Sequence, residues 1–291
     1  MSTVLSKRQV EKLIMTDVGK SDEIIDCCSK NGYKIIDFDD KAYPKRLKEI
    51  INPPAVLYVD GELPDIDNLV CIGMVGTRKA SEYAIKAAHI MAKGITEAGA
   101  LVVSGGALGI DTYSHLGALA CGGKTVAVLG NGLGNNYLKA NEGLRNMIKQ
   151  SGALVTEYQP NVPANRTSFP MRNRIISGLS LGILVVEAGV KSGSLITANL
   201  AIEQNRDVYA VPASIFSSDF SGTNKLISDG ARLAINPVNV VEAYENDYPT
   251  LDLSKIRTAN EIVLDNSEKT LDTSIAVSYT HLRAHETRHD L

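Results

Sequence analysis

Residues 160–199 read PNVPANRTSFPMRNRIISGLSLGILVVEAGVKSGSLITAN. The apolar run 181–186 has the length of a strand buried in a parallel sheet, and the periodic segment after residue 194 predicts a helix. Between them lie Gly189 and the turn Ser192–Gly193–Ser194. A small-residue turn from a strand to a helix presents backbone N–H groups at the positive end of the helix dipole. The stretch therefore predicts a site for a phosphate or a similar anion.

Three arginines precede this strand, in a segment that we interpret as a loop. They are Arg166, Arg172 and Arg174, with Asn173 between the last two. No acidic residue lies between positions 158 and 186. We therefore expect the arginine charge to be uncompensated and to face the anion site.

Apolar, β-branched runs alternate with helical patterns on both sides of this stretch. Strands are expected at 55–59, 69–75, 100–104, 125–129, 153–156, 183–186, 208–211 and 232–235, and helices near 80–98, 109–121, 140–151, 195–204, 222–229 and 238–245. Such alternation is typical of an α/β protein with a mostly parallel sheet and helices on both faces. In these sheets, ligands bind beyond the carboxyl ends of the strands.

Four of the expected strands end in a small, glycine-rich turn. The turns are Gly76–Thr77–Arg78–Lys79, Ser104–Gly105–Gly106–Ala107, the run 130–134, and the run 189–194. Because parallel strands bring their carboxyl ends to one edge, these turns present backbone N–H groups along a common rim. The sequence thus predicts an extended surface that can meet several phosphates.

The chain divides into three parts by its patterning. A short helical segment at 1–45 also contains a possible strand at 34–38, the α/β domain spans 46–248, and a weakly structured tail spans 249–291. His281, His285 and His289 have a metal-like helical spacing, but their surroundings indicate that roughly the last 15 residues are a non-native extension. We therefore expect no metal site.

The composition is that of an ordinary globular protein. The chain has 291 residues, a formal net charge of −3 and four cysteines without a CxxC pair. A field depends on where charges lie, so this balance excludes a protein that is basic all over but allows a local basic groove. There is no apolar signal core and no membrane-length run. We expect a reduced, cytoplasmic protein with no membrane contact and no cofactor.

Several motifs have a plain structural interpretation. The run 130–134 is GxGxG rather than GxGxxG, which favours a tight strand-to-helix turn over a dinucleotide site. Asp111 and His115 are expected to be structural, since no serine or cysteine nucleophile accompanies them. Glu187 is a candidate for glycoside-bond chemistry or for orienting nearby arginines, and we favour the second role. Tyr83, Tyr113, Tyr137 and Phe169 are the candidates for base stacking.

Six stretches in this order resemble the bacterial DNA-processing protein A family. They are MVGTRKAS at 74–81, SGGALGID at 104–111, AVLGNGLGNNYLKAN at 127–141, FPMRNRIISGLS at 169–180, VVEAGVKSGSLITANLAIEQNRDVYAVPAS at 185–214 and GTNKLISDGARL at 222–233. The resemblance implies an extended Rossmann-like domain that binds single-stranded DNA without cutting it. It also implies a homodimer that loads the recombinase RecA during natural transformation.

By the family pattern, Arg78 and Lys139 are DNA-contacting cations, and the segment Arg172–Asn173–Arg174 and the turn Ser192–Ser194 line the same pocket. With the glycine-rich turns, the expected DNA site comprises Gly76, Thr77, Arg78, Ser104, Gly105, Gly106, Lys139, Arg172, Asn173, Arg174, Ser192, Gly193 and Ser194. The chain departs from the family at Leu108, where a basic residue is common. We therefore expect weaker DNA binding.

Two other functions stay open at this stage. A phosphoribohydrolase of nucleoside monophosphates resembles this fold, but its PGGxGTxxE motif is replaced here by EAGVKSGS at 187–194. A carrier of a small phosphorylated ligand is the second alternative.

Overall fold

Nine strands form one sheet in the computed structural model, which describes residues 19–256. The strands are β1 Lys34–Asp37, β2 Val56–Gly61, β3 Cys71–Val75, β4 Leu101–Ser104, β5 Thr125–Val128, β6 Ala153–Thr156, β7 Gly182–Val185, β8 Asp207–Ala210 and β9 Arg232–Leu233. Their order across the sheet is β1-β2-β6-β5-β4-β3-β7-β8-β9. The seven strands from β6 to β9 are parallel, and β2 pairs antiparallel with both β6 and β1. This confirms the predicted α/β class.

The order of the strands reverses at β3. From β3 the chain moves outward through β4, β5 and β6, and it then returns to place β7 on the other side of β3. In open α/β sheets such a reversal separates the two adjoining strand-to-helix turns and creates a crevice at the carboxyl edge. Here the adjoining turns follow Val75 and Val185.

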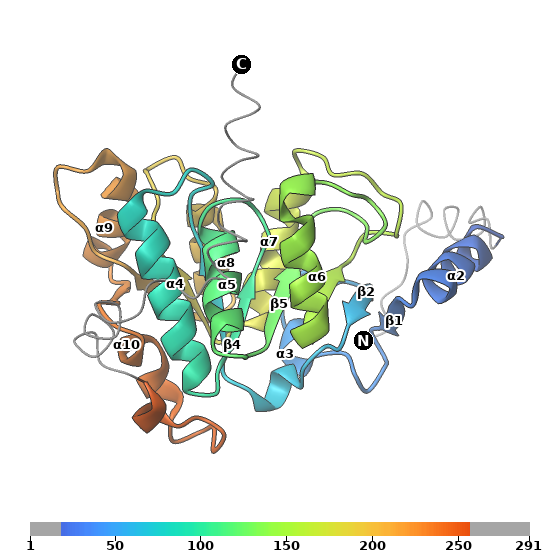
Figure 1. Cartoon of the computed structure of the whole chain (residues 1–291), viewed down its shortest axis with the longest axis horizontal. Coiled ribbons are helices and arrows are strands. Elements are labelled where there is room, and N and C mark those ends of the chain that lie inside the picture. Colours follow the sequence, from blue (N-terminus) through green and yellow to red (C-terminus); the bar gives the residue numbers. More distant parts are fainter. Residues whose placement is uncertain (1–18, 257–291) are drawn as a thin grey trace, which may run out of the picture.

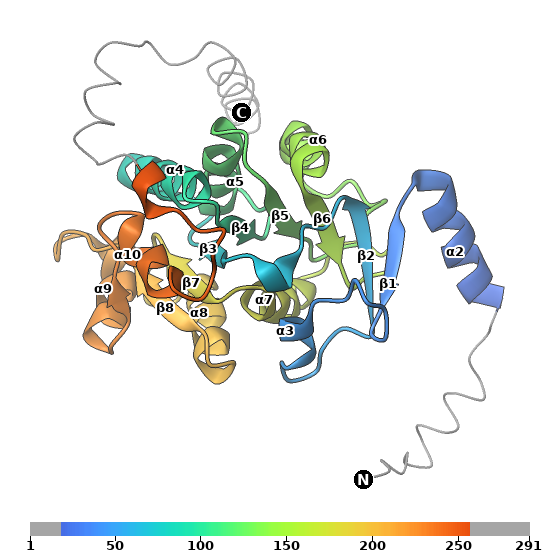
Figure 2. The same cartoon turned by 90° about the horizontal axis from the view of Figure 1, so that it is seen from below.

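Helices cover both faces of the sheet (Figures 1 and 2). Three lie on one face: α4 Glu82–Glu97, α5 Ile110–Ala120 and α6 Glu142–Ser151. The other face carries α3 Lys45–Lys48, α7 Ser168–Leu179 and α8 Ser194–Glu203. The remaining helices are α2 Gly19–Asn31 beside β1, and α9 Ser221–Ser228 and α10 Val238–Val241 near β8. Short 3-10 turns lie at Ile66–Asn68, Lys139–Asn141, Ser218–Phe220, Glu242–Tyr244 and Leu253–Lys255.

The strands β3 to β7 are buried on both faces, as the continuous apolar runs predicted. Val103 and Val185 belong to the core cluster under α7 and α8, whereas their neighbours Val102 and Leu184 belong to the cluster under α4 and α5. Successive side chains of a strand point to opposite faces, so one apolar run supplies both cores. Two packed layers hold the turns at the carboxyl edge in place.

The segment that contains Arg172 and Arg174 is a helix, so the prediction of a loop was wrong. Pro170 lies in the first turn of α7, where its missing N–H group breaks no helical hydrogen bond. The Asn165 carboxamide oxygen accepts hydrogen bonds from the N–H groups of Thr167 and Ser168 at the helix start. Ile175, with Ile176 and Leu179, packs in the core. The arginines and the glycine of this segment led us to expect a loop, although the segment forms a helix with a buried face.

The expected N-terminal segment contributes to the sheet. The strand expected at 34–38 is confirmed as β1, and it pairs antiparallel with β2. The strand expected at 232–235 is shorter and ends at Leu233. Residues 1–18 of the predicted helical segment, and the histidines at 281, 285 and 289, lie outside the described residues.

Candidate functional site

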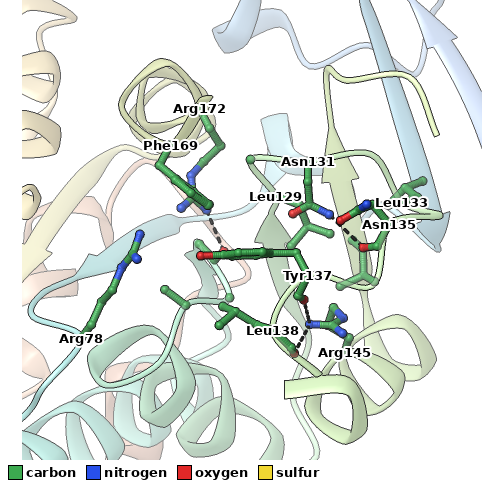
Figure 3. Close-up of a pocket in the computed structure, with 15 residues that line it drawn as sticks. Arg78, Leu129, Asn131, Leu133, Asn135, Tyr137, Leu138, Arg145, Phe169 and Arg172 are labelled. Carbon is green, nitrogen blue, oxygen red and sulfur yellow. Dashed lines mark hydrogen bonds between the residues drawn. The ribbon is translucent and has the colours of Figure 1, made fainter. Parts of the chain in front are cut away.

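The four glycine-rich turns lie at one edge of the sheet, because β3, β4, β5 and β7 are parallel neighbours. A cavity opens at this edge, beyond β4 and β5. Its lining combines three arginines, two aromatic rings, two asparagines, apolar side chains and glycine backbone (Figure 3). The lining residues are Arg78, Gly105, Gly106, Ala107, Leu129, Gly130, Asn131, Leu133, Asn135, Tyr137, Leu138, Arg145, Leu154, Phe169 and Arg172.

Arg78 is the exposed cation of this cavity. Its guanidinium lies 5.0 Å from the centroid of the Phe169 ring, within range of a cation–π contact. The Tyr137 ring lies 5.3 Å from Phe169, and Figure 3 shows it reaching toward Arg78. A planar cation and two rings thus line one wall, beside exposed charge. Such a wall suits a ligand with both a phosphate and an aromatic ring.

The turn that carries Arg78 is fixed from two sides. The N–H group of Thr77 donates to the carbonyl of Glu187 after β7, and the carbonyl of Thr77 accepts from Ile110 N at the start of α5. Gly109 has a φ of +74°, and a Cβ there would lie 2.4 Å from the Thr77 carbonyl oxygen. The turns after β3, β4 and β7 therefore form one hydrogen-bonded unit.

Arg172 is buried, with 5% of its surface exposed, and it reaches the cavity from α7 rather than from the expected loop. Its guanidinium donates to the carbonyls of Gly105 and Val128. A Cβ at Gly105 would overlap this guanidinium, which explains the glycine. Arg172 is thus a cation beneath the cavity that ties the ends of β4 and β5 together.

Buried side chains also fix the Ser104–Ala107 turn. One Asp111 carboxylate oxygen accepts from the N–H groups of Gly105 and Ala107, at 3.1 and 3.2 Å. The Asn141 carboxamide donates to the carbonyls of Gly106 and Ala107. Within the described range, the N–H group of Gly106 between them has no hydrogen-bond partner. The turn is preorganised, and it leaves one amide for a ligand.

Burial is the main cause of the pKa shifts of the ionisable side chains beneath the cavity. Burial raises the pKa of the Asp111 carboxyl and lowers that of the Arg172 guanidinium, and each charge opposes the other's shift. Burial, together with the charge of Arg172, lowers the pKa of His115 to about 3, so this imidazole is neutral at pH 7. Its Nδ1 lies 2.7 Å from the Thr125 hydroxyl. Asp111 and His115 make structural hydrogen bonds within the protein, in line with the structural role expected from the sequence.

Arg174 does not carry uncompensated charge, which corrects the sequence-based expectation. Its Nη1 and Nη2 atoms lie 2.9 and 2.6 Å from the two Glu157 carboxylate oxygens. Glu157 lies just before the stretch 158–186 that lacks acidic residues, so that stretch did not indicate an ion pair between Arg174 and Glu157. This forked geometry occupies both terminal nitrogens of Arg174.

The turn at 189–194 leads from β7 into α8, as predicted. The hydroxyls of Ser192 and Ser194 lie 2.7 Å apart. The cavity lining includes neither this turn nor Lys139, Asn173 and Arg174. Lys139 is exposed in the 3-10 turn just after Leu138. These residues therefore lie outside the cavity, although they stay candidates for contact with a longer ligand.

Glu187 orients a turn rather than an arginine, contrary to the expectation from sequence. It is 1% exposed, and one carboxylate oxygen accepts from the N–H group and the hydroxyl of Ser81, at 2.9 and 3.3 Å. Ser81 in turn caps α4. Burial raises the pKa of the Glu187 carboxyl.

The motif interpretation missed Arg145, Asn131 and Asn141. Asn131 donates to the carbonyls of Gly132 and Asn135 and shapes the GxGxG turn. Gly132 packs against residues 159–162, where a Cβ would overlap the Gln159 carbonyl, so the tight-turn interpretation explains the glycine. The polar residues of NNYLKAN at 135–141 were the available signal for these contacts.

Among the described residues, no His, Cys, Asp and Glu side chains are grouped to hold a metal ion. Within the same range, none of the helices has both the length and the apolar content to span a bilayer.

The chain matches the family described as DNA recombination-mediator protein A over residues 34–245. The chain belongs to this family. It is 39% identical over 213 residues to the DNA processing protein DprA of Bacillus subtilis, covering 73% of this chain and 72% of that one. It is 40% identical over 206 residues to the DprA of Streptococcus pneumoniae, covering 71% and 72%.

Solved structures of DprA proteins have the same fold. That of Streptococcus pneumoniae DprA has a TM-score of 0.72 at 36% identity and covers 80% of each chain. That of Helicobacter pylori DprA has a TM-score of 0.67 at 29% identity, covering 74% of this chain and 97% of that one, and its description concerns a single-stranded DNA binding mode. The extended Rossmann-like fold implied by the family resemblance is thus confirmed.

Proposed function

We propose that this protein binds single-stranded DNA along the carboxyl edge of its sheet. The observation that carries the proposal is the wall of the cavity, where exposed Arg78 stacks on Phe169 beside Tyr137 at a glycine-rich rim. Single-strand binders combine a cationic path for the backbone with aromatic rings for the bases. The DprA of Helicobacter pylori, for which single-stranded DNA binding is described, supports the proposal.

In the proposed mode, Arg78 forms a forked contact with a phosphate, and the unpaired Gly106 amide donates to a phosphate oxygen. A base enters the cavity and stacks on the Tyr137 and Phe169 rings. Lys139, Asn173, Thr77 and the turn Ser192–Ser194 contact neighbouring phosphates outside the cavity. The guanidinium nitrogens of Arg172 and Arg174 bond to the protein itself. These two residues therefore contribute by holding the rim in place and through the electrostatic field of their charges.

The protein in this proposal binds DNA without cutting it. Asp111 and Glu187 both accept hydrogen bonds from backbone N–H groups, and His115 is neutral and fully buried. From the family resemblance we further propose a cytoplasmic homodimer that protects incoming strands and loads RecA onto them during transformation. Cross-linking of the purified chain and RecA pull-down in the presence of oligo-dT test these two contacts.

Fluorescence anisotropy with labelled oligo-dT and with a duplex of equal length tests the proposed function. At two salt concentrations, we expect single-strand preference and a log–log slope of about −0.7 for each neutralised phosphate. Binding that is indifferent to strandedness and salt would contradict the proposal. Release of free adenine from AMP, followed by chromatography, would instead favour the phosphoribohydrolase, and a small phosphorylated ligand in native mass spectrometry would favour the carrier.

A further inference from the structure

Arg145 lines the cavity but directs its guanidinium at the protein's own backbone. Its Nη1 atom donates to the carbonyl oxygens of Tyr137 and Leu138, at 2.9 and 3.0 Å. Its Nη2 atom donates to the side-chain oxygen of Asn136 at 2.8 Å. Figure 3 shows the contacts of Arg145 with Tyr137 and Leu138, beneath the Tyr137 ring. One side chain thus clamps three successive residues of the loop that follows β5.

The clamped loop contains an uncommon backbone conformation. Leu138 has φ of 57° and ψ of 69°, in the left-handed region. A non-glycine residue rarely adopts this region, and does so where surrounding contacts fix it. The two carbonyls held by Arg145 are those of Tyr137 and Leu138, so the clamp holds the peptide groups on both sides of the Leu138 Cα atom.

The clamp determines where the Tyr137 side chain lies. The ring of Tyr137 contacts Phe169, which contacts Arg78. Phe169 belongs to α7 and Arg78 to the turn after β3, and both are anchored by the packed sheet. Tyr137 instead belongs to a long connection between β5 and α6. Without Arg145, the carbonyls of Tyr137 and Leu138 would lose the side-chain donor that holds this part of the connection.

We propose that Arg145 is a positioning residue, which holds Tyr137 against Phe169 so that the two rings form a prebuilt platform for a nucleobase. The proposal rests on the proposed function, since it assigns a base-stacking role to that site. Preorganising an aromatic side chain strengthens binding because the cost of ordering it is met before the ligand arrives. Arg145 thus acts through Tyr137 rather than through a phosphate.

The rival role for Arg145 is direct contact with a phosphate. Two observations oppose it: both terminal nitrogens already donate to protein oxygens, and the side chain is half-buried. Arg78 at the other side of the cavity is exposed and offers the matching comparison. A positioning role and a phosphate contact predict different effects of the Arg145→Ala change on the salt dependence of DNA binding and on the binding of a strand without bases.

Anisotropy with oligo-dT, and with an abasic oligonucleotide of equal length, separates these roles. We expect Arg145→Ala to weaken binding of oligo-dT between about fivefold and about 150-fold, the range for loss of one stacked base. The salt slope should stay as in the wild type, and the abasic strand should bind both proteins equally. Lys149→Ala, on the same helix but paired with Asp60, is the control and should bind as the wild type does.

A slope that becomes less negative by about 0.7, with an equal defect on the abasic strand, would overturn the inference and make Arg145 a phosphate ligand. Unchanged oligo-dT binding by Arg145→Ala would also overturn it. If the wild type itself fails to bind oligo-dT, the proposed function falls and the base-stacking role falls with it.

A measurement without DNA tests the positioning directly. In the free wild-type protein, nuclear Overhauser contacts between the ring protons of Tyr137 and Phe169 should be present, because the rings lie 5.3 Å apart by their centroids. They should be lost in Arg145→Ala, while the amide spectrum of the sheet is retained. Persistence of the ring contacts in the variant would overturn the inference, whatever DNA binding shows.

Discussion

Four arginines at the carboxyl edge of the sheet have different surroundings, and these decide what each can do. Arg78 is exposed and stacks on a ring, Arg145 clamps a loop, Arg172 donates to buried carbonyls, and Arg174 pairs with Glu157. The sequence placed Arg78, Arg172 and Arg174 together in one phosphate site and did not single out Arg145. Only the contacts of each guanidinium distinguish a DNA-contacting arginine from one that builds the site.

Arg78→Ala should weaken oligo-dT binding by about tenfold, or about 1.4 kcal/mol, because a forked phosphate contact is lost. The log–log salt slope should become less negative by about 0.7. Anisotropy at several salt concentrations measures both. Lys225→Ala, whose side chain pairs with Asp229 on α9, is the control and should change neither quantity. Unaltered affinity and slope in Arg78→Ala would remove this residue from the site.

Arg172→Met should act first on stability. Two buried carbonyls lose their donor, at about 1 to 3 kcal/mol each, so we expect the free energy of unfolding to fall by about 2 to 6 kcal/mol. Urea denaturation followed by circular dichroism measures this loss. A variant that keeps wild-type stability but binds DNA poorly would show that Arg172 contacts the strand directly, against its buried position.

His115 should make the protein less stable as the pH falls. The native state holds its pKa near 3, against an ordinary value of 6.5, so the unfolded chain binds more protons between these values. The contribution of neutral His115 to the free energy of unfolding is present above pH 6.5 and is lost as the pH falls toward 3. We expect a loss of about 2 kcal/mol between pH 7 and pH 5.

Urea denaturation of the wild type and of His115→Gln at both pH values measures this contribution. The variant should lose about 2 kcal/mol less than the wild type, because it has no imidazole to protonate in the unfolded state. An equal pH dependence in the two proteins would show that another group is responsible.

At the level of elements, the strands and their turns could be predicted from sequence, whereas the helix α7 could not. Buried parallel strands are continuous apolar runs, and each glycine-rich turn follows such a run directly, so one-dimensional patterning was sufficient. The apolar face of α7 is interrupted by Arg172, which is buried only because carbonyls from β4 and β5 accept its hydrogen bonds. That contact joins residues far apart in the chain.

The candidate site divides in the same way. The turns at 76–79 and 104–107 were predicted, and so were the candidate rings Tyr137 and Phe169. The clamp formed by Arg145 was not predicted. It depends on the left-handed conformation of Leu138, and leucine, unlike glycine or asparagine, does not indicate that conformation in a sequence. The pairing of Arg174 was missed because its partner Glu157 comes from a different element.

Gly109→Ala should disturb the neighbouring Thr77–Arg78 turn. Gly109 has a φ of +74°, and a Cβ there would lie 2.4 to 2.7 Å from the backbone of these two residues. We expect a loss of about 1 to 3 kcal/mol in stability, together with weaker oligo-dT binding. Gly143→Ala is the control, since a Cβ there meets nothing within 4 Å and the residue lies outside the proposed DNA contacts. Thermal denaturation and anisotropy should show Gly109→Ala impaired and Gly143→Ala near wild type; equal behaviour of the two would contradict this expectation.

For the whole molecule, the order of the strands explains why distant segments meet. β3 lies between β4 and β7 in the sheet, so the turns after these three strands adjoin although more than 100 positions separate Thr77 from Glu187. Helices on both faces fix the strands, and the loop to α6 adds Tyr137 above them (Figure 3). The fold therefore brings charge, free amide and rings to one rim.

A crystal structure of the protein with a short oligo-dT tests the central claim most directly. The account predicts a phosphate within hydrogen-bonding distance of the Arg78 guanidinium, another phosphate oxygen at the Gly106 amide, and a thymine stacked on the Tyr137 and Phe169 rings. A strand bound at another face of the sheet, with this cavity left empty, would contradict it.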